Sequence, residues 1–233
     1  MSIAENLAAV RERVANAARK AGRGESDVKL MAVCKTFPAE AIREAYAAGQ
    51  RLFGENRVQE FGEKAPKVAD LLGLEMHLIG HLQSNKAYKA AELFQAVDSV
   101  DSLKLAERLN ASAGMLRKKL PVLIEVNVGG EEAKSGVEPK AAAVGTILDA
   151  APSLANLELR GLMTVPPYTE DPEGARQYFR KLRDLRDEVA KSTGVQLREL
   201  SMGMSHDFEV AIEEGSTCVR VGTAIFGVRA KKP

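Results

Sequence analysis

The segment PVLIEVNV (residues 121–128) is the strongest strand-like run in the chain, and it decides how the fold is interpreted. A helical segment over about 138–151 follows it, and a second strand-like run, LELRGLMTV (157–165), comes next. Two strands that are joined by a helix lie parallel in one sheet, with a right-handed crossover between them. The chain therefore contains at least one unit of a parallel α/β fold.

The same alternation of strand and helix covers the rest of the chain. Working outward, we expect six further strands, over 28–35, 51–56, 76–80, 96–100, 197–202 and 217–222. Helices are expected over about 4–21, 39–49, 56–71, after residue 85, 102–114, 138–151, 171–192 and 207–214, with a last turn or helix at AIFG. Eight strand–helix units in 233 residues match the usual size of a (β/α)8 barrel.

The predicted fold is thus α/β: one domain over residues 1–233, a (β/α)8 TIM barrel with an additional N-terminal helix. The alternative is an open doubly wound sheet, which normally carries a glycine-rich fingerprint after its first strand. This chain has CKTFPAE (34–40) at that place. No linker or low-complexity segment marks a second domain.

Composition and charge exclude several classes of protein. The chain has 33 Lys and Arg against 32 Asp and Glu, a net charge of +1, and 45% hydrophobic residues. Such a balance gives no general attraction for nucleic acid or anionic lipid, and no apolar run approaches the roughly 20 residues that cross a bilayer. Two cysteines, Cys34 and Cys218, are too few for a disulfide framework, and Cys34 is expected to pack in the helix layer. We expect a cytoplasmic monomer without a signal peptide that binds neither nucleic acid nor membrane.

Polar side chains follow nearly every predicted strand. In a barrel, the strand ends and the loops after them form the face that carries chemistry. Burying polar groups costs free energy without improving the packing, so their clustering at one end favours a binding site there. The residues at these junctions are Lys35, Glu55, Asn56, His81, Gln83, Lys86, Asp98, Asp101, Asn127, Lys134, Thr164, Ser205, His206, Asp207, Arg220 and Thr223.

Lys35 is the sharpest chemical feature of the sequence. It ends the apolar run 28–35, so we expect its amine to point into the mouth of the barrel. Partial burial disfavours an ammonium group and lowers the pKa of a lysine, which makes the amine a nucleophile able to form a Schiff base. The alternative is a lysine that extends from a strand end into solvent, and its position alone favours that alternative.

The segment Arg220–Thr223 makes the Schiff-base role of Lys35 more plausible than its position alone suggests. The backbone N–H groups of Gly222 and Thr223 would point at an anion at the start of a helix, and barrels commonly bind phosphate after their seventh and eighth strands. Ser205, in the neighbouring loop, adds a hydroxyl group. The alternative is an ordinary strand-to-helix turn. Paired with a lysine at the mouth, the segment favours an aldehyde cofactor that carries a phosphate.

The histidines have plainer interpretations. His77 and His81 straddle a strand end, and no third ligand accompanies them, so a zinc site is not expected. His206 and Asp207 offer an acid–base pair, but we expect Ser205 or Asp207 to cap the following helix instead. The sequence assigns no role to His81 or His206.

Six segments together resemble the pyridoxal phosphate homeostasis proteins, single-domain relatives of alanine racemase. They cover nearly the whole chain in the order of that family, and they are AVCKTFP, FGENRVQE, HLIGHLQSNK, KSGV, RGLMTV and LSMGMSHDFEVAIEEGSTCVRVGTAIFG. The resemblance implies a fold-type III barrel that binds one pyridoxal 5′-phosphate covalently, as an aldimine on Lys35. It also implies phosphate contacts from Ser205 and from the backbone of Gly222 and Thr223.

The same resemblance places Arg220 opposite the pyridine nitrogen, Asn56 beside the cofactor ring and Lys134 near the mouth. It implies a carrier and regulator in vitamin B6 homeostasis, without established catalytic activity. Apo-enzymes that need the cofactor are the implied acceptors.

Two arguments favour a protein that holds the cofactor over an enzyme that uses it for catalysis. A cation opposite the pyridine nitrogen disfavours its protonation and weakens the cofactor as an electron sink. Only VRAKKP (228–233) follows Gly227, so we expect no second domain to supply an opposite-face base. The alternatives are an amino-acid racemase or lyase that uses pyridoxal phosphate, and a phosphate-binding barrel enzyme without it.

Overall fold

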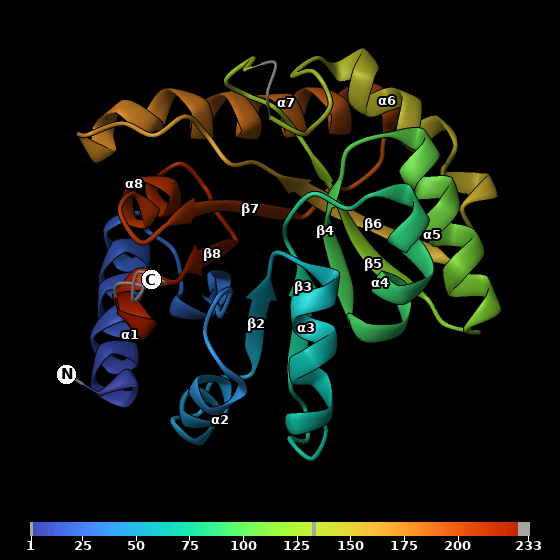
Figure 1. Ribbon diagram of the computed structural model, residues 1–233. Coiled ribbons are helices and arrows are strands. Elements are labelled where there is room, and N and C mark those ends of the chain that lie inside the picture. Colours follow the sequence, from blue (N-terminus) through green and yellow to red (C-terminus); the bar gives the residue numbers. More distant parts are fainter. Residues whose placement is uncertain (1, 132–133, 228–233) are drawn as a thin grey trace.

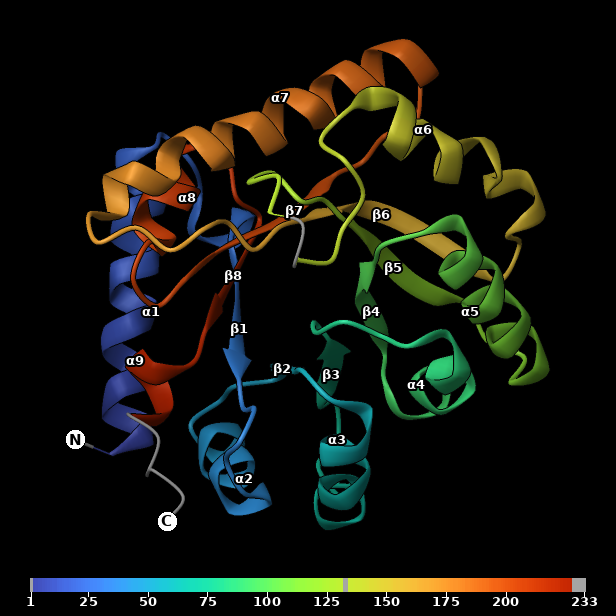
Figure 2. The same ribbon diagram turned by 45° about the horizontal axis from the view of Figure 1, so that its top comes forward.

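The computed structural model describes residues 2–131 and 134–227, and the strands of these residues close into a parallel barrel. The strands β1 to β8 are hydrogen-bonded in sequence order, and β8 completes the ring against β1. Figure 1 shows helices outside the strands, and Figure 2 shows the strand labels following one another around a ring. The (β/α)8 prediction is confirmed, and the doubly wound sheet is wrong. The strand bounds are Lys29–Val33, Leu52–Glu55, Glu75–Leu78, Ala96–Val100, Leu120–Glu125, Leu157–Met163, Glu199–Met204 and Cys218–Val221.

The additional N-terminal helix is α1 (Ile3–Lys20), which packs against α8 and α9. Ser2 and Glu5 form a capping box at its start, and Leu7 and Val10 lie on its buried face. In the part of the chain that the structure describes, no helix combines the length and apolar character needed to cross a membrane. The other helices are α2 (Ala39–Ala47), α3 (Val58–Lys64), α4 (Ala87–Leu93), α5 (Leu103–Met115), α6 (Ala141–Asp149), α7 (Arg176–Thr193), α8 (Phe208–Glu213) and α9 (Thr223–Phe226).

Several elements are shorter than the sequence predicts. The strand predicted over 28–35 ends at Val33, which leaves Lys35 in the turn after β1. Similarly, β5 ends at Glu125, although the next residue, Val126, is still buried. A run of apolar residues indicates which residues are buried, not which ones pair in the sheet. At the barrel mouth, residues remain buried beyond the last pair of hydrogen-bonded strand residues. The helix predicted over 56–71 ends at Lys64, as α3, and a 3-10 turn follows it. The proline in this turn has no backbone N–H to donate to the preceding turn of helix, so α3 cannot continue.

The apolar core lies between the strands and the surrounding helices. Its largest fully buried side chains include Phe53, Phe94, Phe179 and Phe208. Cys34 is buried in the same core, as expected, and it is a free thiol. Buried polar side chains also lie on the strands: Glu55, Asp98, Ser99, Glu125, Ser201 and Arg220.

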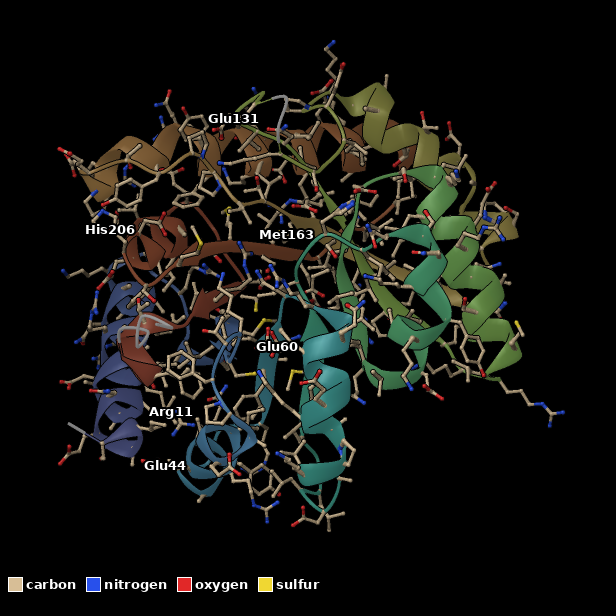
Figure 3. The ribbon with its side chains drawn as sticks, viewed as in Figure 1. Arg11, Glu44, Glu60, Glu131, Met163 and His206 are labelled. Atoms are coloured by element: carbon tan, nitrogen blue, oxygen red, sulfur yellow. The ribbon has the colours of Figure 1, made fainter. Side chains whose placement is uncertain are left out.

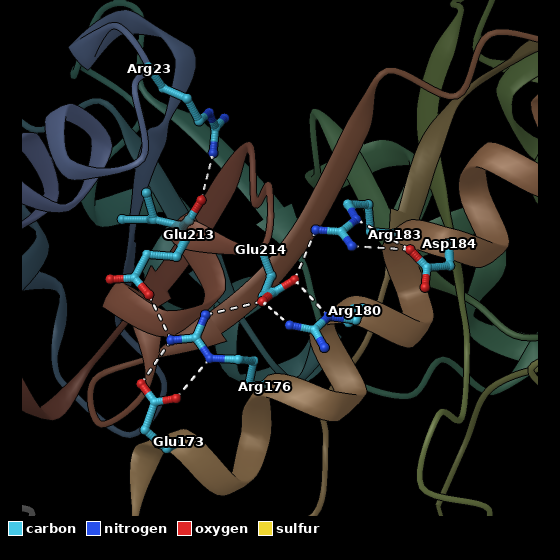
Figure 4. Close-up of polar contacts among 9 residues, drawn as sticks. Arg23, Glu173, Arg176, Arg180, Arg183, Asp184, Glu213 and Glu214 are labelled. Carbon is cyan, nitrogen blue, oxygen red and sulfur yellow. Dashed lines mark hydrogen bonds and ion pairs between the residues drawn. The ribbon is translucent and has the colours of Figure 1, made fainter.

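A cluster of arginines on α7 fastens that helix to α8. Arg176, Arg180 and Arg183 each donate to the carboxylate of Glu214, at N–O distances of 3.0, 3.0 and 2.8 Å (Figure 4). Burial raises the pKa of Glu214, but the hydrogen bonds from Arg180 and Arg176 outweigh it and lower the pKa overall. The cluster therefore holds a carboxylate against α7 and fixes α8 (Phe208–Glu213), the helix that follows the loop of Ser205.

Candidate functional site

The turn after β1 carries Lys35 to the carboxyl end of the barrel. Cys34 continues the pairing with β2 through its N–H, which donates to Gly54 O at 3.0 Å. Phe37 N–H then donates to Cys34 O at 3.1 Å, which closes the turn around Lys35. Lys35 lies two residues beyond the last residue of β1, and it is half-buried there.

Ser205 and the start of α9 converge on one point. The Ser205 hydroxyl accepts hydrogen bonds from Gly222 N–H at 3.2 Å and from Ala224 N–H at 3.4 Å. The sequence names Ser205, Gly222 and Thr223 as phosphate contacts, and the structure places the Ala224 amide beside Ser205 as well. A hydroxyl and two amides within hydrogen-bond reach of one another form a group that suits an anion.

Arg220 lies inside the barrel on β8 and is 4% exposed. Its guanidinium donates to Ser201 Oγ on β7 and to Thr164 O after β6, both at 2.7 Å. Burial lowers the pKa of Arg220, while nearby thiol and carboxyl groups, including those of Cys218, Asp98 and Glu125, act in the opposite direction. Two hydrogen bonds thus fix the orientation of a buried cation beside the mouth.

Asn56 follows β2, and the chain after β3 packs directly against it. A side chain at Gly80 would place its Cβ 2.4 Å from Asn56 O, so only glycine permits this approach. Ser99 Oγ donates to Gly80 O at 2.7 Å and holds the segment there. A cavity of about 350 Å³ opens beside Asn56, lined by Arg57, Val58, Gln59, His81, Leu82, Gln83 and Lys86.

Glu125 is a candidate residue that the sequence prediction missed. It ends β5, is 9% exposed, and its buried Oε2 is without a hydrogen-bond partner among the described residues. Burial, and secondarily Asp101, raises the pKa of Glu125 to about 7, although Arg220 and His81 act in the opposite direction. The available signal was a charged residue inside the apolar run PVLIEVNV, and such a residue is costly to bury without a purpose.

The other predicted polar residues have local partners. His206 contacts Glu170 O at 3.0 Å and stacks near Tyr168, so it does not form an acid–base pair with Asp207. Asp207 stands at the start of α8, but its carboxylate accepts from Met204 N–H at 2.7 Å, upstream of the helix. Asp207 is the N-cap residue of α8, as the sequence predicts, but its carboxylate and the Ser205 hydroxyl bond to groups outside that helix (Figure 3 shows His206 beside α8).

The histidines after β3 and the loop lysine pair with neighbouring groups. His77 Nδ1 lies 3.2 Å from Asp98, and His81 Nδ1 lies 3.0 Å from Asp101. Lys134 contacts Pro166 O at 3.3 Å and pairs with the Glu131 carboxylate. Within residues 2–131 and 134–227, no cluster of His, Cys, Asp and Glu has the arrangement of a metal site.

Comparison with known sequences gives a family and named relatives. The chain matches the family described as "Alanine racemase, N-terminal domain" over residues 6–230. It is 49% identical over 229 residues to the pyridoxal phosphate homeostasis protein of Aquifex aeolicus, a match that covers 98% of this chain and 99% of that protein. The protein of the same name from Pseudomonas aeruginosa is 47% identical over 228 residues, covering 98% and 96%.

Solved structures agree with these sequence matches. PipY of Synechococcus elongatus, in a structure with PLP bound, is 41% identical with a TM-score of 0.83, covering 97% of this chain and 100% of that one. Alanine racemase of Clostridium difficile is 18% identical with a TM-score of 0.71, covering 99% of this chain and 58% of that one. The likeness to alanine racemase at this identity shows the fold alone.

We expect Glu125→Gln to stabilise the protein at alkaline pH. The pKa of Glu125 rises from 4.5 to about 7, so the unfolded chain ionises first and stability is lost as the pH rises through this window. Glutamine keeps the shape and cannot ionise. Its gain in the free energy of unfolding should therefore be roughly 2 kcal/mol larger at about pH 8 than at about pH 5.

Urea unfolding at the two pH values measures this difference. The matched control is Glu107→Gln, which makes the same substitution at an exposed position on α5. A pH-independent effect of Glu125→Gln would show that this carboxyl group titrates normally.

Proposed function

The chain belongs to the pyridoxal phosphate homeostasis proteins, whose barrel is the alanine racemase N-terminal domain, and on this premise we propose that it carries pyridoxal 5′-phosphate in vitamin B6 homeostasis. The observation that carries the proposal is the placement of Lys35, Ser205, Arg220 and Gly222 on neighbouring parts of the ring. They come from β1, β7 and β8 or the loops after them, and these strands are neighbours in the ring. PipY, 41% identical to this chain, has a structure with PLP bound.

The residues present fit the two ends of such a ligand. The Ser205 hydroxyl and the amides of Gly222 and Ala224 offer uncharged donors for a phosphate dianion. We assign backbone contacts to Gly222 and Thr223 as well. A half-buried lysine in the turn after β1 offers the amine for the aldehyde end, and we assign this role to Lys35.

Arg220 is proposed to face the ring nitrogen, and Asn56 to lie beside the ring. When bound, the cofactor supplies an aldehyde for reversible linkage to an amine and a ring that can accept electrons. Arg220 is held by Ser201 and Thr164, so its charge cannot turn away from the mouth. A fixed cation there disfavours protonation of the ring nitrogen. It therefore favours a protein that holds the cofactor over one that uses it for carbanion chemistry.

The relatives are named as homeostasis proteins rather than as enzymes. We accordingly propose that this chain has no sustained catalytic turnover. One observation favours the second candidate, a racemase or lyase that uses pyridoxal phosphate: Glu125 is buried at the end of β5, and its Oε2 has no hydrogen-bond partner among the described residues. Burial raises the pKa of this carboxyl group to about 7, in the range where a proton donor or acceptor is most effective.

We propose a cytoplasmic, monomeric protein that passes the cofactor to apo-enzymes. Cys34 and Cys218 are both buried free thiols, which suits a reducing compartment. An acceptor that binds the aldehyde more tightly would draw the cofactor from a reversible linkage on Lys35.

Lys35→Ala should abolish the covalent adduct and leave the fold intact. Lys35 lies in a turn and is half-buried, so its removal opens no large cavity in the core. Borohydride reduction followed by peptide mass mapping locates the modified lysine in the unmodified protein and in the variant. Lys86→Ala is the matched control and should keep the adduct. Adduct on another lysine in the unmodified protein would overturn the assignment.

The phosphate should supply most of the reversible affinity. Ser205→Ala removes one hydroxyl and should weaken binding by about tenfold. Gly222→Val should weaken it further, because a Cβ at Gly222 already lies 3.3 Å from Val33 O and a branched side chain crowds the amides. Absorbance titrations with pyridoxal phosphate and with pyridoxal measure both effects. Equal affinity for the two compounds would contradict the phosphate assignment.

The loaded protein should transfer its cofactor without turning over amino acids. We expect activation of an apo-aminotransferase mixed with the loaded protein, and no chiral or keto product from a panel of L- and D-amino acids. Loaded Glu125→Gln separates the two candidate functions, since it should leave transfer unchanged. Turnover on the order of 1 per second or faster, lost in Glu125→Gln, would replace the carrier with an enzyme.

A further inference from the structure

Two side chains of α3 hold the peptide groups on either side of Lys35. Lys64 Nζ donates to Cys34 O at 3.1 Å, and the Glu60 carboxylate accepts from Thr36 N–H. Figure 3 shows Glu60 on α3, on the side of β2. The residue before Lys35 and the residue after it are therefore both tied to the same helix.

These two side chains belong to one ionic network. Lys64 and Glu60 are four positions apart on α3 and lie 2.8 Å from each other. Lys64 also lies 2.7 Å from the Glu55 carboxylate at the end of β2, and that carboxylate is fully buried. The network links β2, α3 and the turn after β1, and it has Lys64 at its centre.

Thr36 adopts a backbone conformation that its side chain disfavours. Its φ is 68°, in the left-handed region, which is uncommon for a β-branched residue. Such a conformation persists only where the surroundings impose it. The bond from Thr36 N–H to Glu60 and the bond from Phe37 N–H to Cys34 O are the contacts that impose it here.

A gain in the stability of the fold does not by itself explain why this ionic network is buried. Replacing a buried ion pair by apolar side chains of similar size is often neutral or stabilising. Burial acts to lower the pKa of Lys64, but its hydrogen bonds to Glu55 and Glu60 reverse the shift and keep the ammonium charged. A charged, fully engaged amine is no nucleophile, so Lys64 does not compete with Lys35 for an aldehyde.

We propose that Lys64 and Glu60 are positioning residues for Lys35, because they fix the peptide groups that set the direction of its side chain into the mouth. The proposal rests on the proposed function of Lys35 as the amine that binds the cofactor. Neither side chain touches the cofactor in this account, and both act through the backbone of the turn.

Four variants and one control test the proposal. Glu60→Ala and Lys64→Met remove the bonds to Thr36 and Cys34, whereas Glu60→Gln and Lys64→Arg can still make them. Glu63→Gln changes an exposed carboxylate on the same helix and serves as the matched control. We expect Glu60→Ala and Lys64→Met to slow formation of the covalent adduct by about tenfold or more and to shift its absorbance–pH profile.

The conservative variants should restore the rate to within about threefold of the unmodified protein, because hydrogen bonds of similar geometry remain possible. Stopped-flow absorbance after mixing with pyridoxal phosphate gives the rate, and titration of the band gives the profile. A purely structural network would lower the unfolding temperature without moving either quantity. If Glu60→Ala and Lys64→Met match Glu63→Gln in rate and profile, the proposal is wrong.

Amide hydrogen exchange of the ligand-free protein tests the same contacts without the cofactor. We expect the Thr36 amide to exchange at least about tenfold faster in Glu60→Ala than in Glu63→Gln, since its acceptor is gone. Unchanged exchange would refute the proposal even if the adduct forms. If the unmodified protein forms no adduct on Lys35, the proposed function fails, and exchange at Thr36 still decides whether α3 holds the turn. Glu60→Ala changes a partly exposed side chain, and folding is checked by its circular dichroism.

Discussion

Closure of the barrel between β8 and β1 is the constraint on which the site depends. Lys29 pairs with Cys218 and Ala32 with Val221, so the first and last strands of the chain run side by side. This pairing places the turn after β1, which carries Lys35, beside the end of β8, from which α9 begins. An open sheet with the same elements would leave these groups at opposite edges. The grouping of these candidate residues at one end of the barrel therefore depends on closure of the ring.

The sequence was sufficient for the fold and for part of the site. Strand–helix alternation follows from local periodicity, and a lysine or a glycine at a strand end is visible in the letters. Glu125 was missed because an apolar run hides whether its one charged side chain points inward. The network of Glu55, Glu60 and Lys64 was missed because an ion pair between β2 and α3 is decided by packing. The predicted end of the first strand was wrong because residues beyond Val33 are still buried although they no longer belong to the strand. The predicted end of the helix that stops at Lys64 was wrong because a proline interrupts it.

Charges inside the barrel are arranged in two different ways. Lys64 is surrounded by partners, with carboxylates on two sides and a carbonyl on a third. Arg220 is hydrogen-bonded to a hydroxyl and a carbonyl, and it has no carboxylate at hydrogen-bond distance among the described residues. Groups of the first kind fix geometry, because every donor is used. The carboxyl groups of Asp98 and Glu125 act on Arg220 only from beyond hydrogen-bond distance, and its assignment to the site rests on the family resemblance.

The same contrast explains how one mouth can hold a ligand firmly and release it. The N–H groups of Gly222 and Ala224 already donate to Ser205 Oγ, so an anion that binds these amides exchanges existing hydrogen bonds. Such an exchange lowers the net gain from the two amide contacts, because both amides are hydrogen-bonded with and without the anion. The turn at Thr36, in contrast, holds a disfavoured conformation through contacts with the protein itself, at Glu60 and at Cys34 O. Rigid presentation of the amine together with exchangeable donors at the anion end is the combination that a reversible carrier requires.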